Sequence, residues 1–484
     1  MKNREMNMAL KVYNVLTRTK EDFKTLTPGV VKMYACGITV SGDAHIGHAY
    51  QSVVFDVITR YLRHLGYDVK YVRNYTDVDD KIIANAAKAG EDPIAFAEKY
   101  MKQTDSEMDA LGNEHPTIMA RATQCIDDII NFVQKLIDSG HAYVSEFGDV
   151  YFKLSSFAEY GKLSHIQVDK NDTGVRKDIE PGKQNDLDFA LWKSAKPGEI
   201  AWKSPWGMGR PGWHIECSAM NLKYLGEQID IHGGGRDLVF PHHENEIAQT
   251  ESLTGKQFAK YWIHCGLVKV NGQKMSKSLN NGILLKDVLK KYDADTIRFT
   301  LLRNTYSADI DITDSLLPES RKHIYKMYST FLSLNGRDFS GADNAKTDAK
   351  INDIKNEFEK AMNDNFNTLE VIAASFGWFN FINAESAKKS TEYDLQRIAN
   401  TIKELFGILN ILQQNPAEYV NTVKNTVLQQ SGLTESDIEK YINERAIAKQ
   451  NKDWATADKV RTDLLEKGIV LKDTPNGTNW DVNL

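Results

Sequence analysis

The chain lacks the features of secreted, membrane-spanning and fibrous proteins. It has only four cysteines among 484 residues, far below the density of small disulfide-held domains. No apolar run approaches the roughly 20 residues that a membrane-spanning helix needs, and the polar N-terminus has no signal-peptide core. Eleven prolines and 31 glycines argue against a fibrous or disordered chain. We therefore expect a cytoplasmic protein with reduced thiols and no membrane partner.

An excess of one charge is also missing. The chain has 60 Lys and Arg residues against 66 Asp and Glu residues, for a net charge of −6. This balance gives no general attraction to nucleic acid, so any nucleic-acid surface has to be a local basic patch. Hydrophobic residues make up 41% of the chain, which is ample for a packed core.

Residues 30–80 alternate between strand and helix patterns. A short strand is predicted at Val30–Tyr34, apolar residues then recur at helical spacing as far as Leu65, and Tyr67–Val72 is predicted as a second strand. Strand, helix and strand at this spacing indicate a parallel βαβ unit. We therefore expect an α/β fold.

The pattern changes after this unit. Ala120–Gly140 has the periodicity of an amphipathic helix, and short polar and aromatic segments follow it, which indicates an insertion. A glycine-punctuated α/β pattern returns over 207–270. Residues 413–425 are interpreted as a linker. The rest comprises a helical region, 318–415, and a small final unit, 430–484.

A first candidate for chemistry is His45-Ile46-Gly47-His48, at the start of a predicted helix. A helix N-terminus presents unpaired N–H groups and a positive dipole end, which suits phosphate. The histidines could bond phosphate oxygens, and Gly47 would let a nucleotide approach the backbone. The alternative is that both histidines are merely polar residues at a helix start, and this short motif alone favours that alternative.

A second candidate is Lys274-Met275-Ser276-Lys277-Ser278, after the turn at Asn271-Gly272. Two lysines on a polar loop could neutralise a triphosphate and the departing pyrophosphate. The alternative is a solvated basic loop. Together with the histidine motif, however, the lysine motif is a strong indication of nucleotide chemistry.

A third candidate is a metal site. His242 and Glu246 are four residues apart and share a face on a helix. A histidine, a carboxylate and two thiolates form an acceptable tetrahedral zinc set, but no C-x-x-C pair identifies the thiolates. Two cysteines lie in apolar patterns typical of the core, Cys125 and Cys265. This leaves Cys36 and Cys217 as the candidate thiolates.

These motifs and the stretches around them resemble the cysteinyl-tRNA synthetase family of class I aminoacyl-tRNA synthetases. The resemblance covers nearly the whole chain. The matching stretches outside the two signature motifs are Tyr34–Gly37, Tyr71–Asn74, Thr76–Lys81, Arg210–Met220, Phe240–Glu246, Ala361–Thr368 and Trp454–Asp458.

The resemblance implies a Rossmann-type parallel-sheet catalytic domain that is split by an insertion and followed by three further parts. The implied catalytic domain comprises residues 1–114 and 207–255, with the insertion at 115–206. The further parts are a stem-contact segment at 256–317 that carries the Lys274–Ser278 loop, a helical domain at 318–415 and an anticodon-binding module at 430–484.

The resemblance also implies a two-step reaction. ATP with Mg²⁺ and L-cysteine would give cysteinyl-adenylate and pyrophosphate, and the cysteinyl group would move to the 3′-terminal adenosine of tRNA-Cys. One zinc ion would recognise cysteine as a thiolate, because the oxygen of serine is a harder and less acidic ligand. Pocket size alone separates such near-isosteres only modestly. We expect the protein to be a monomer.

Site residues follow from the resemblance by motif position. The implied zinc ligands are Cys36, Cys217, His242 and Glu246. His242 is chosen over His243 because of the face that it shares with Glu246. The implied phosphate contacts are His45, His48, Lys274 and Lys277. The implied nucleotide contacts are Gly47, Gly235, Asp237 and again Lys277, and the implied cysteine pocket is Thr76, Trp213 and His232.

Simpler alternatives accompany several of these assignments. Gly235 and Asp237 could belong to a plain tight turn, and the pocket residues could serve packing or capping. Trp454 or Trp480 could stack on an anticodon base, but the core interpretation comes first for both. The sequence departs from the family at Ile38, at Ser41-Gly42, at Tyr50 and in its non-basic C-terminus.

Two rival functions stay open. A cysteine ligase that acts on an amino sugar resembles the catalytic half, including its zinc site, but lacks the extended C-terminal part. A non-catalytic RNA-binding relative would have no need of the intact histidine and lysine motifs.

Overall fold

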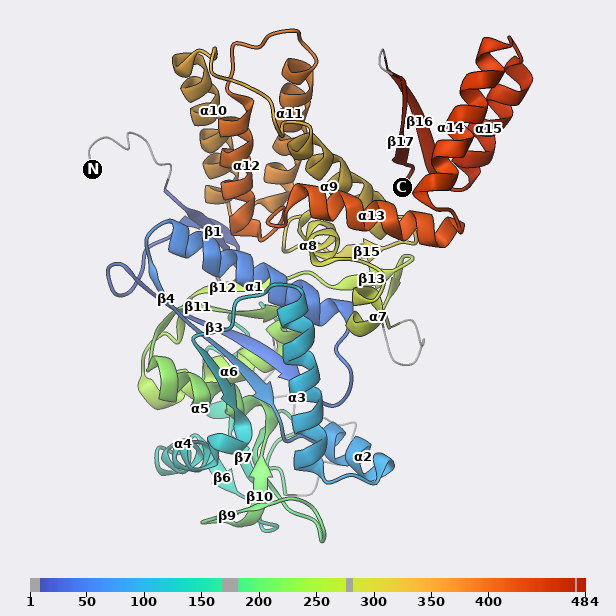
Figure 1. Ribbon diagram of the computed structural model, residues 1–484. Helices are drawn as coiled ribbons and strands as arrows, with labels where there is room; N and C mark the ends of the chain where they lie inside the picture. The colour runs from blue at the N-terminus through green and yellow to red at the C-terminus, as the bar shows by residue number, and fades with distance from the viewer. Residues whose placement is uncertain (1–8, 168–181, 276–281, 475–476) are drawn as a thin grey trace. The chain divides into compact units, whose positions relative to one another are not determined.

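The computed structural model describes residues 9–167, 182–275, 282–474 and 477–484. The chain divides into two compact units (Figure 1). Unit 1 consists of Met1–Ala294, Leu301–Ile312 and Asn356–Ala374. Unit 2 consists of Asp295–Thr300, Thr313–Lys355 and Ser375–Leu484.

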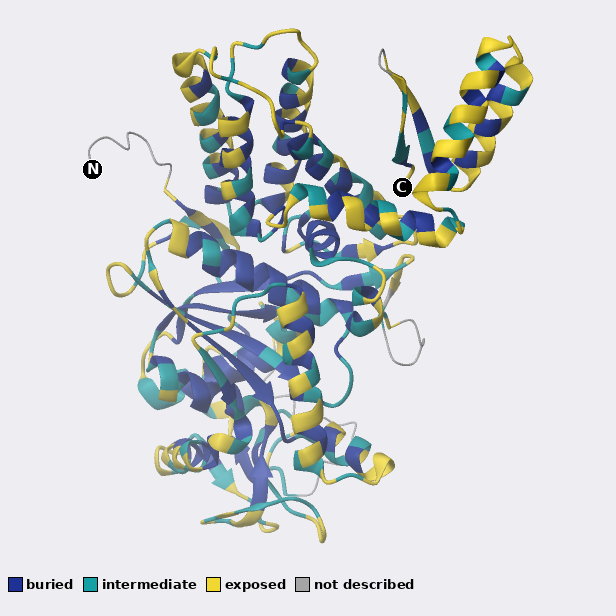
Figure 2. Ribbon diagram, in the orientation of Figure 1, coloured by how far each residue is buried: buried dark blue, intermediate teal, exposed yellow. Residues whose placement is uncertain are grey.

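Unit 1 is built on a five-stranded parallel sheet with the order β12-β11-β3-β4-β5. Figure 2 shows four of these strands, all but the edge strand β5, buried along most of their length, as expected for a parallel sheet covered by helices. The predicted α/β class is therefore confirmed. The strands are β3 (Val30–Thr39), β4 (Asp68–Thr76), β5 (Ile118–Arg121), β11 (Ile229–Gly235) and β12 (Ala259–Cys265).

The strand order reverses between β3 and β11. From β3 the chain moves outward to β4 and β5, and it later returns to place β11 and β12 on the other side of β3. At such a switch point the connections leave in opposite directions, so a crevice opens at the carboxyl ends of the two strands. Ligands of α/β proteins bind there, which places the candidate site before any side chain is considered.

Strand β3 is longer than the predicted Val30–Tyr34 because it continues through an irregularity at Gly37. The pairing of β3 with β4 shifts register between Ala35 and Ile38, and the Gly37 N–H donates to Asn74 Oδ1 at 2.9 Å. A Cβ at Gly37 would lie 1.6 Å from the Asn74 carbonyl oxygen. Glycine therefore lets the strand run on and carries Cys36 into the sheet.

Helices cover this sheet. Helix α1 packs on β4 and β12, whereas α5 packs on β3 and β4. Tyr34 and Cys36 of β3 belong to a buried cluster with residues of the helices α4, α5 and α6. The helices of this part are α1 (Ile46–His64), α2 (Asp80–Ala89), α3 (Pro93–Ala110), α4 (Ile126–Asp138), α5 (Trp213–Leu225) and α6 (Glu244–Thr254).

A second, antiparallel sheet has the order β6-β7-β8-β10-β9 and forms the insertion. The expected boundaries differ from the pairing at three strands, because β5 and β12 belong to the parallel sheet and β10 to the insertion. Local periodicity does not show which distant strand a segment pairs with. The strands are β6 (Ala142–Val144), β7 (Val150–Phe152), β8 (Phe189–Ser194), β9 (Trp202–Ser204) and β10 (Gly207–Pro211).

The predicted linker at 413–425 is wrong, since Pro416 opens a helix, α13. Asn415 caps this helix by accepting hydrogen bonds from the Ala417 and Glu418 N–H groups. Asparagine followed by proline is a helix-start signal as much as a turn signal. Unit 2 contains α9 (Leu316–Leu332), α12 (Leu395–Leu409), α13 (Pro416–Ser431), α14 (Glu435–Gln450), α15 (Trp454–Glu466), β16 (Ile469–Thr474) and β17 (Gly477–Val482).

The core interpretation of Trp454 is also wrong. Its side chain at the start of α15 is 60% exposed, whereas Trp480 on β17 is half-buried beneath the Lys424 ammonium. The remaining strands and α-helices are β1 (Lys11–Asn14), β2 (Thr19–Asp22), β13 (Val268–Val270), β14 (Gln273–Lys274), α7 (Leu285–Leu289), α8 (Ala294–Leu302), β15 (Ile310–Ile312), α10 (Asn344–Asn363) and α11 (Thr368–Ser386).

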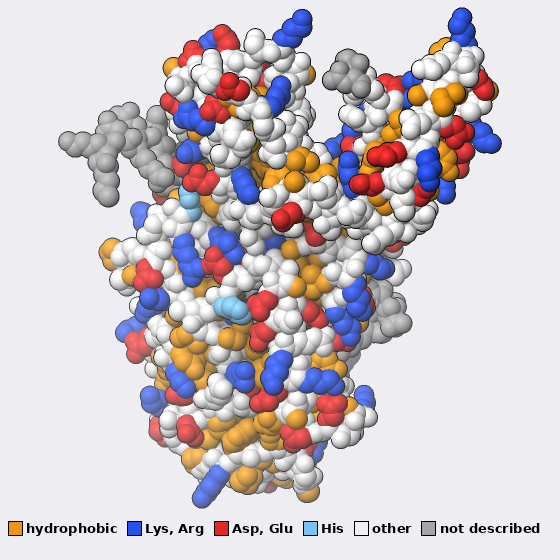
Figure 3. Space-filling model, viewed as in Figure 1, with side chains coloured by type: hydrophobic (Ala, Val, Ile, Leu, Met, Phe, Trp, Pro, Cys, Tyr) orange, Lys and Arg blue, Asp and Glu red, His pale blue; other side chains and the backbone are white. Residues whose placement is uncertain are grey.

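The surface carries both signs of charge. Figure 3 shows Lys and Arg side chains interspersed with Asp and Glu on the face in view, as the small net charge predicts. Among the described residues, none of the helices combines the length and apolar character needed to cross a membrane.

Candidate metal and nucleotide site

Four buried side chains converge beside the switch point. Cys36 comes from β3, Cys217 from α5, Glu246 from the first turn of α6 and His242 from the turn just before it. One ligand atom from each lies within 4.8 Å of the others. The structure therefore brings together the four residues that the family resemblance implies as zinc ligands.

The donor atoms of this cluster lie at short distances. The two sulfur atoms are 3.6 Å apart, and Cys36 Sγ lies 3.2 Å from Glu246 Oε1. His242 Nε2 lies 3.0 Å from the same carboxylate oxygen, the pair being four residues apart. Two thiols, an imidazole and a carboxylate form the ligand set that tetrahedral zinc accepts, so the residues present fit this metal.

A second group of four overlaps the first. His232 and His243 also lie with Cys36 and Glu246 as a possible metal-binding set. The two sets share the Cys36 thiol and the Glu246 carboxylate, so one ion would be bound by one set or by the other. The first set offers two thiols and the second only one. Since thiolate is the softer ligand, the first set suits zinc better.

The two cysteines share one proton between them. The Cys36 thiol donates a hydrogen bond that lowers the pKa of Cys217 to about 6. Burial, together with this neighbouring thiolate, raises the pKa of Cys36 well above its usual value. At neutral pH the pair therefore carries a thiolate on Cys217 and a thiol on Cys36.

His242 and Glu246 form a buried ion pair. Burial opposes the charge on His242, but the Glu246 carboxylate and Cys217 outweigh it and raise the pKa of His242 to about 10. Burial likewise opposes ionisation of Glu246, but His232 and His242 hold its pKa well below the usual range. Without a metal, the site therefore holds an imidazolium, a carboxylate and one thiolate.

The outer nitrogen of His242 is held by a residue that the sequence reasoning missed. His242 Nδ1 lies 2.9 Å from Nδ1 of His214. Burial keeps the pKa of His214 well below its usual value, so His214 is neutral and its Nδ1 accepts a hydrogen bond from Nδ1–H of His242. This contact turns Nε2 toward Glu246. The spacing of His214 to Cys217, one helical turn on α5, was a signal that could have revealed it.

Two of the three predicted cysteine-pocket residues contact this cluster directly, and the third contacts a neighbouring residue. The Trp213 indole stacks on the His242 ring with centroids 4.3 Å apart. His232 is fully buried, with Nε2 3.6 Å from Cys36 Sγ. Thr76 instead donates its hydroxyl to Glu216 at 2.9 Å, so its described contact is with the residue next to Cys217. Burial raises the pKa of Glu216 well above its usual value.

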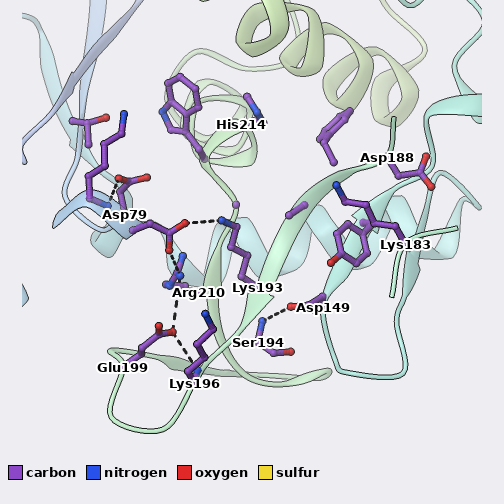
Figure 4. A pocket seen from close by; sticks show the side chains of 18 residues that line it. Asp79, Asp149, Lys183, Asp188, Lys193, Ser194, Lys196, Glu199, Arg210 and His214 are labelled. Carbon is purple, nitrogen blue, oxygen red and sulfur yellow. Dashed lines mark hydrogen bonds and ion pairs between the residues drawn. The ribbon is translucent and has the colours of Figure 1, made fainter. Parts of the chain in front are cut away.

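A cavity of about 710 Å³ opens beside Trp213 and His214 (Figure 4). Among the residues that line it, Asp80 of α2 forms ion pairs with two cations of the insertion, Lys193 at 2.8 Å and Arg210. The cavity thus lies between the catalytic sheet and the insertion, and it reaches the residues that contact His242.

The two histidines of the first motif form the start of α1. His45 is the N-cap, and each ring accepts a hydrogen bond through Nδ1 from the backbone N–H of the other residue, at 3.3 and 3.4 Å. The rings stack with centroids 3.6 Å apart. Capping therefore engages Nδ1 of both rings, and any contact with phosphate has to be made by Nε2. A side chain at Gly47 would crowd the His45 ring.

The lysine motif lies only partly within the described residues. Lys274 ends β14, whereas Ser276, Lys277 and Ser278 lie outside the described ranges. On its C-terminal side, the Ile46 N–H donates to the Ile283 carbonyl at 2.9 Å, and Leu285 N–H donates to Ala44 at the same distance. The chain that follows the lysine motif is therefore hydrogen-bonded to the histidine motif.

The glycine-rich end of β11 contributes Gly235 and, just beyond it, Asp237. A Cβ at Gly235 would lie 2.5 Å from Asp237 Oδ1, so the carboxylate folds back against the glycine. Both residues lie at the carboxyl end of the strand that borders the switch point.

Comparisons with known proteins show which family the chain resembles. Residues 22–322 match the family described as the tRNA synthetases class I (C) catalytic domain, and 357–413 match the DALR domain. The chain is 47% identical to the "Cysteine--tRNA ligase" of Syntrophotalea carbinolica over 98% of its own length and 99% of that protein. It is 45% identical to the "Cysteine--tRNA ligase" of Geobacter metallireducens over 98% of its length and 100% of that protein.

Solved structures show the same fold at low sequence identity. Methionyl-tRNA synthetase of Mycobacterium tuberculosis with methionyl-adenylate superposes with a TM-score of 0.58, at 16% identity, over 84% of this chain and 94% of that one. A putative arginyl tRNA synthetase from Campylobacter jejuni gives 0.52 at 15% identity, over 80% and 94%.

Proposed function

The chain belongs to the cysteine--tRNA ligase family of class I aminoacyl-tRNA synthetases, and we propose that one zinc ion selects its cysteine substrate. As a member of this family it is an ATP-dependent ligase of cysteine and tRNA. The proposed ligands are Cys36, Cys217, His242 and Glu246. The observation that carries this proposal is the convergence of two thiols, an imidazole and a carboxylate from separate segments into one buried cluster.

Zinc would supply a soft Lewis acid that prefers sulfur to oxygen. The chain's own residues hold and shape that site. His214 fixes the His242 ring, while Trp213 and His232 line the same cluster and are proposed, with Thr76, to hold cysteine. A pocket of this kind rejects serine by chemistry and not by size, since size alone separates near-isosteres only modestly.

For the activation step, we propose that His45 and His48 contact the phosphates of ATP through Nε2. Lys274 and Lys277 are proposed to stabilise the negative charge of the departing pyrophosphate. Mg²⁺ would accompany ATP. In this in-line attack on the α-phosphate, catalysis consists of positioning and charge stabilisation. Gly47 leaves room at the start of α1, and Gly235 and Asp237 are proposed to meet the nucleotide at the end of β11.

The partners follow from the same assignment. We propose that the monomeric protein charges tRNA-Cys on its 3′-terminal adenosine and reads the anticodon with residues 430–484. The exposed ring of Trp454 supports this role, because unpaired bases stack on such rings. An amino-sugar ligase without this C-terminal part fits less well, since cysteine--tRNA ligases match the chain over nearly its full length.

Zinc binding is expected to release about two protons per chain at pH 7, one from Cys36 and one from His242. Cys217, with a pKa of about 6, and Glu246 are already ionised, whereas the pKa values of Cys36 and His242 lie above neutral pH. The zinc affinity should therefore rise about 100-fold per pH unit from pH 7 to 8. Calorimetry of chelator-stripped protein in buffers of different ionisation enthalpy measures both quantities.

A control variant removes a cysteine outside the cluster. Cys125→Ala should keep one zinc per chain and the same proton count, because Cys125 is the N-cap residue of α4 and its thiol is hydrogen-bonded to the Tyr224 hydroxyl. Zinc binding that is unchanged in Cys36→Ala and His242→Ala, or that releases no protons, would contradict the assignment.

A further inference from the structure

A segment of the insertion lies along the start of α6. This bracing segment, Tyr160–Ser164, meets the helix through three successive contacts. The Tyr160 hydroxyl donates to Asn245 Oδ1 at 2.5 Å, and Lys162 pairs with Glu251 at 2.5 Å. The backbone of the segment reaches Glu244, the first residue of α6. Nothing in the sequence patterns indicated this contact.

Glu244 is the central contact. Its fully buried carboxylate accepts hydrogen bonds from the backbone N–H groups of Gly161 at 2.9 Å, Leu163 at 3.1 Å and Ser164 at 2.8 Å. In the described part of the chain, no cation pairs with this carboxylate. A buried charge without a cation depends on such charge-assisted hydrogen bonds, so the segment and Glu244 require each other.

The turn is shaped for this contact. Gly161 has a φ of +97°, and a Cβ there would lie 2.2 Å from the Ile166 carbonyl oxygen. Only glycine adopts this conformation without strain and leaves room for the crossing chain. The three N–H groups are thereby directed at one carboxylate.

The start of α6 has no internal support of this kind. His243, at its N-cap, makes no side-chain capping bond, and the backbone at Phe240 is extended, with φ −139° and ψ 132°. His242 therefore lies between an extended residue and the first regular turn, and its position relative to Glu246 depends on what holds that turn. The bracing segment holds this first turn through Glu244, which lies two residues from His242 and two residues from Glu246.

We propose that Glu244 is a positioning residue for the metal site, and that the insertion serves the site by bracing α6 through it. This inference rests on the proposed zinc function. Glu244 does not reach the metal ligands' donor atoms itself. It fixes the spacing of His242 and Glu246. Residues that orient metal ligands commonly contribute about 10- to 100-fold to metal affinity.

The test is Glu244→Gln, which keeps the shape but removes the charge and one acceptor. We expect the zinc dissociation constant to rise by about 10- to 100-fold, and the KM for cysteine in ATP–pyrophosphate exchange to rise while the KM for ATP stays unchanged. The absorption spectrum of the Co²⁺-loaded variant should shift, since the ligand geometry changes. The matched control is Glu146→Gln, an exposed carboxylate on the same insertion that takes part in none of the bracing contacts.

Tyr160→Phe is a milder second variant in case Glu244→Gln does not fold. It removes only the hydrogen bond to Asn245, and we expect a smaller weakening of zinc binding in the same direction. Zinc affinity and cobalt spectra equal to those of the unmodified protein in both variants would overturn the brace alone. An unmodified protein that binds no zinc would instead overturn the proposed function, and the brace with it.

Discussion

Cys217→Ser is expected to lower kcat/KM for cysteine in ATP–pyrophosphate exchange by at least about 100-fold, because losing a ligand should exceed the 10- to 100-fold effect of losing an outer partner. The substitution exchanges the acidic member of the thiol pair, whose pKa is about 6, for a hydroxyl that does not ionise at neutral pH. The KM for ATP should be unaffected, since the histidine and lysine motifs lie on other segments.

The measurement is exchange at varied cysteine and varied ATP, with the zinc content of each preparation determined. Cys265→Ser is a suitable control, because Cys265 is buried at the end of β12 and belongs to neither metal-binding set. A Cys217→Ser variant with undiminished affinity for cysteine would remove the basis for zinc recognition.

The second large effect is expected at His48. His48→Ala should lower kcat of adenylate formation by about 100- to 1,000-fold, as the loss of a preorganised group that stabilises developing charge typically does. In the structure His48 Nδ1 accepts from the His45 backbone N–H, so alanine also removes a capping bond. A second variant has to separate the two roles.

His48→Asn makes this separation. The asparagine oxygen can replace Nδ1 as the capping acceptor, but nothing replaces Nε2. If the phosphate contact is the main role of His48, the His48→Asn variant should be about as inactive as the His48→Ala variant. Its melting temperature should nevertheless return to that of the unmodified protein. Recovery of exchange activity in His48→Asn would show instead that the motif serves only to begin α1, the alternative that the sequence left open.

The sequence predicted local features well and distant pairings poorly. The βαβ unit around α1 follows from periodicity, but the assignment of β5 and β12 to the parallel sheet depends on strands far away in the chain. Asn415-Pro416 is a signal shared by turns and helix starts, and only the packing of α13 decides between them. Trp454 is exposed at the start of α15 although aromatic residues are usually buried, because the local pattern does not show which side of the helix packs against its neighbours.

Some residues of the candidate site could be predicted from the sequence, and others could not. The i, i+4 spacing of His242 and Glu246 indicated a shared face. The two cysteines come from β3 and α5, so no spacing joins them. Assigning the other two cysteines to the core left them as candidates, and the family resemblance joined them to the histidine and the glutamate. His214 and Glu244 were missed because their roles depend on contacts with neighbours that the sequence does not reveal, an imidazole in one case and the backbone of a distant turn in the other.

The measurement that tests the central claim most directly is the charging of total tRNA with labelled cysteine, with serine as control, on zinc-loaded and zinc-depleted protein. We predict charging with cysteine alone, loss of that charging on depletion, and its return when zinc is restored. Charging with serine, or cysteine charging that is equal with and without zinc, would contradict zinc-based selection of the substrate.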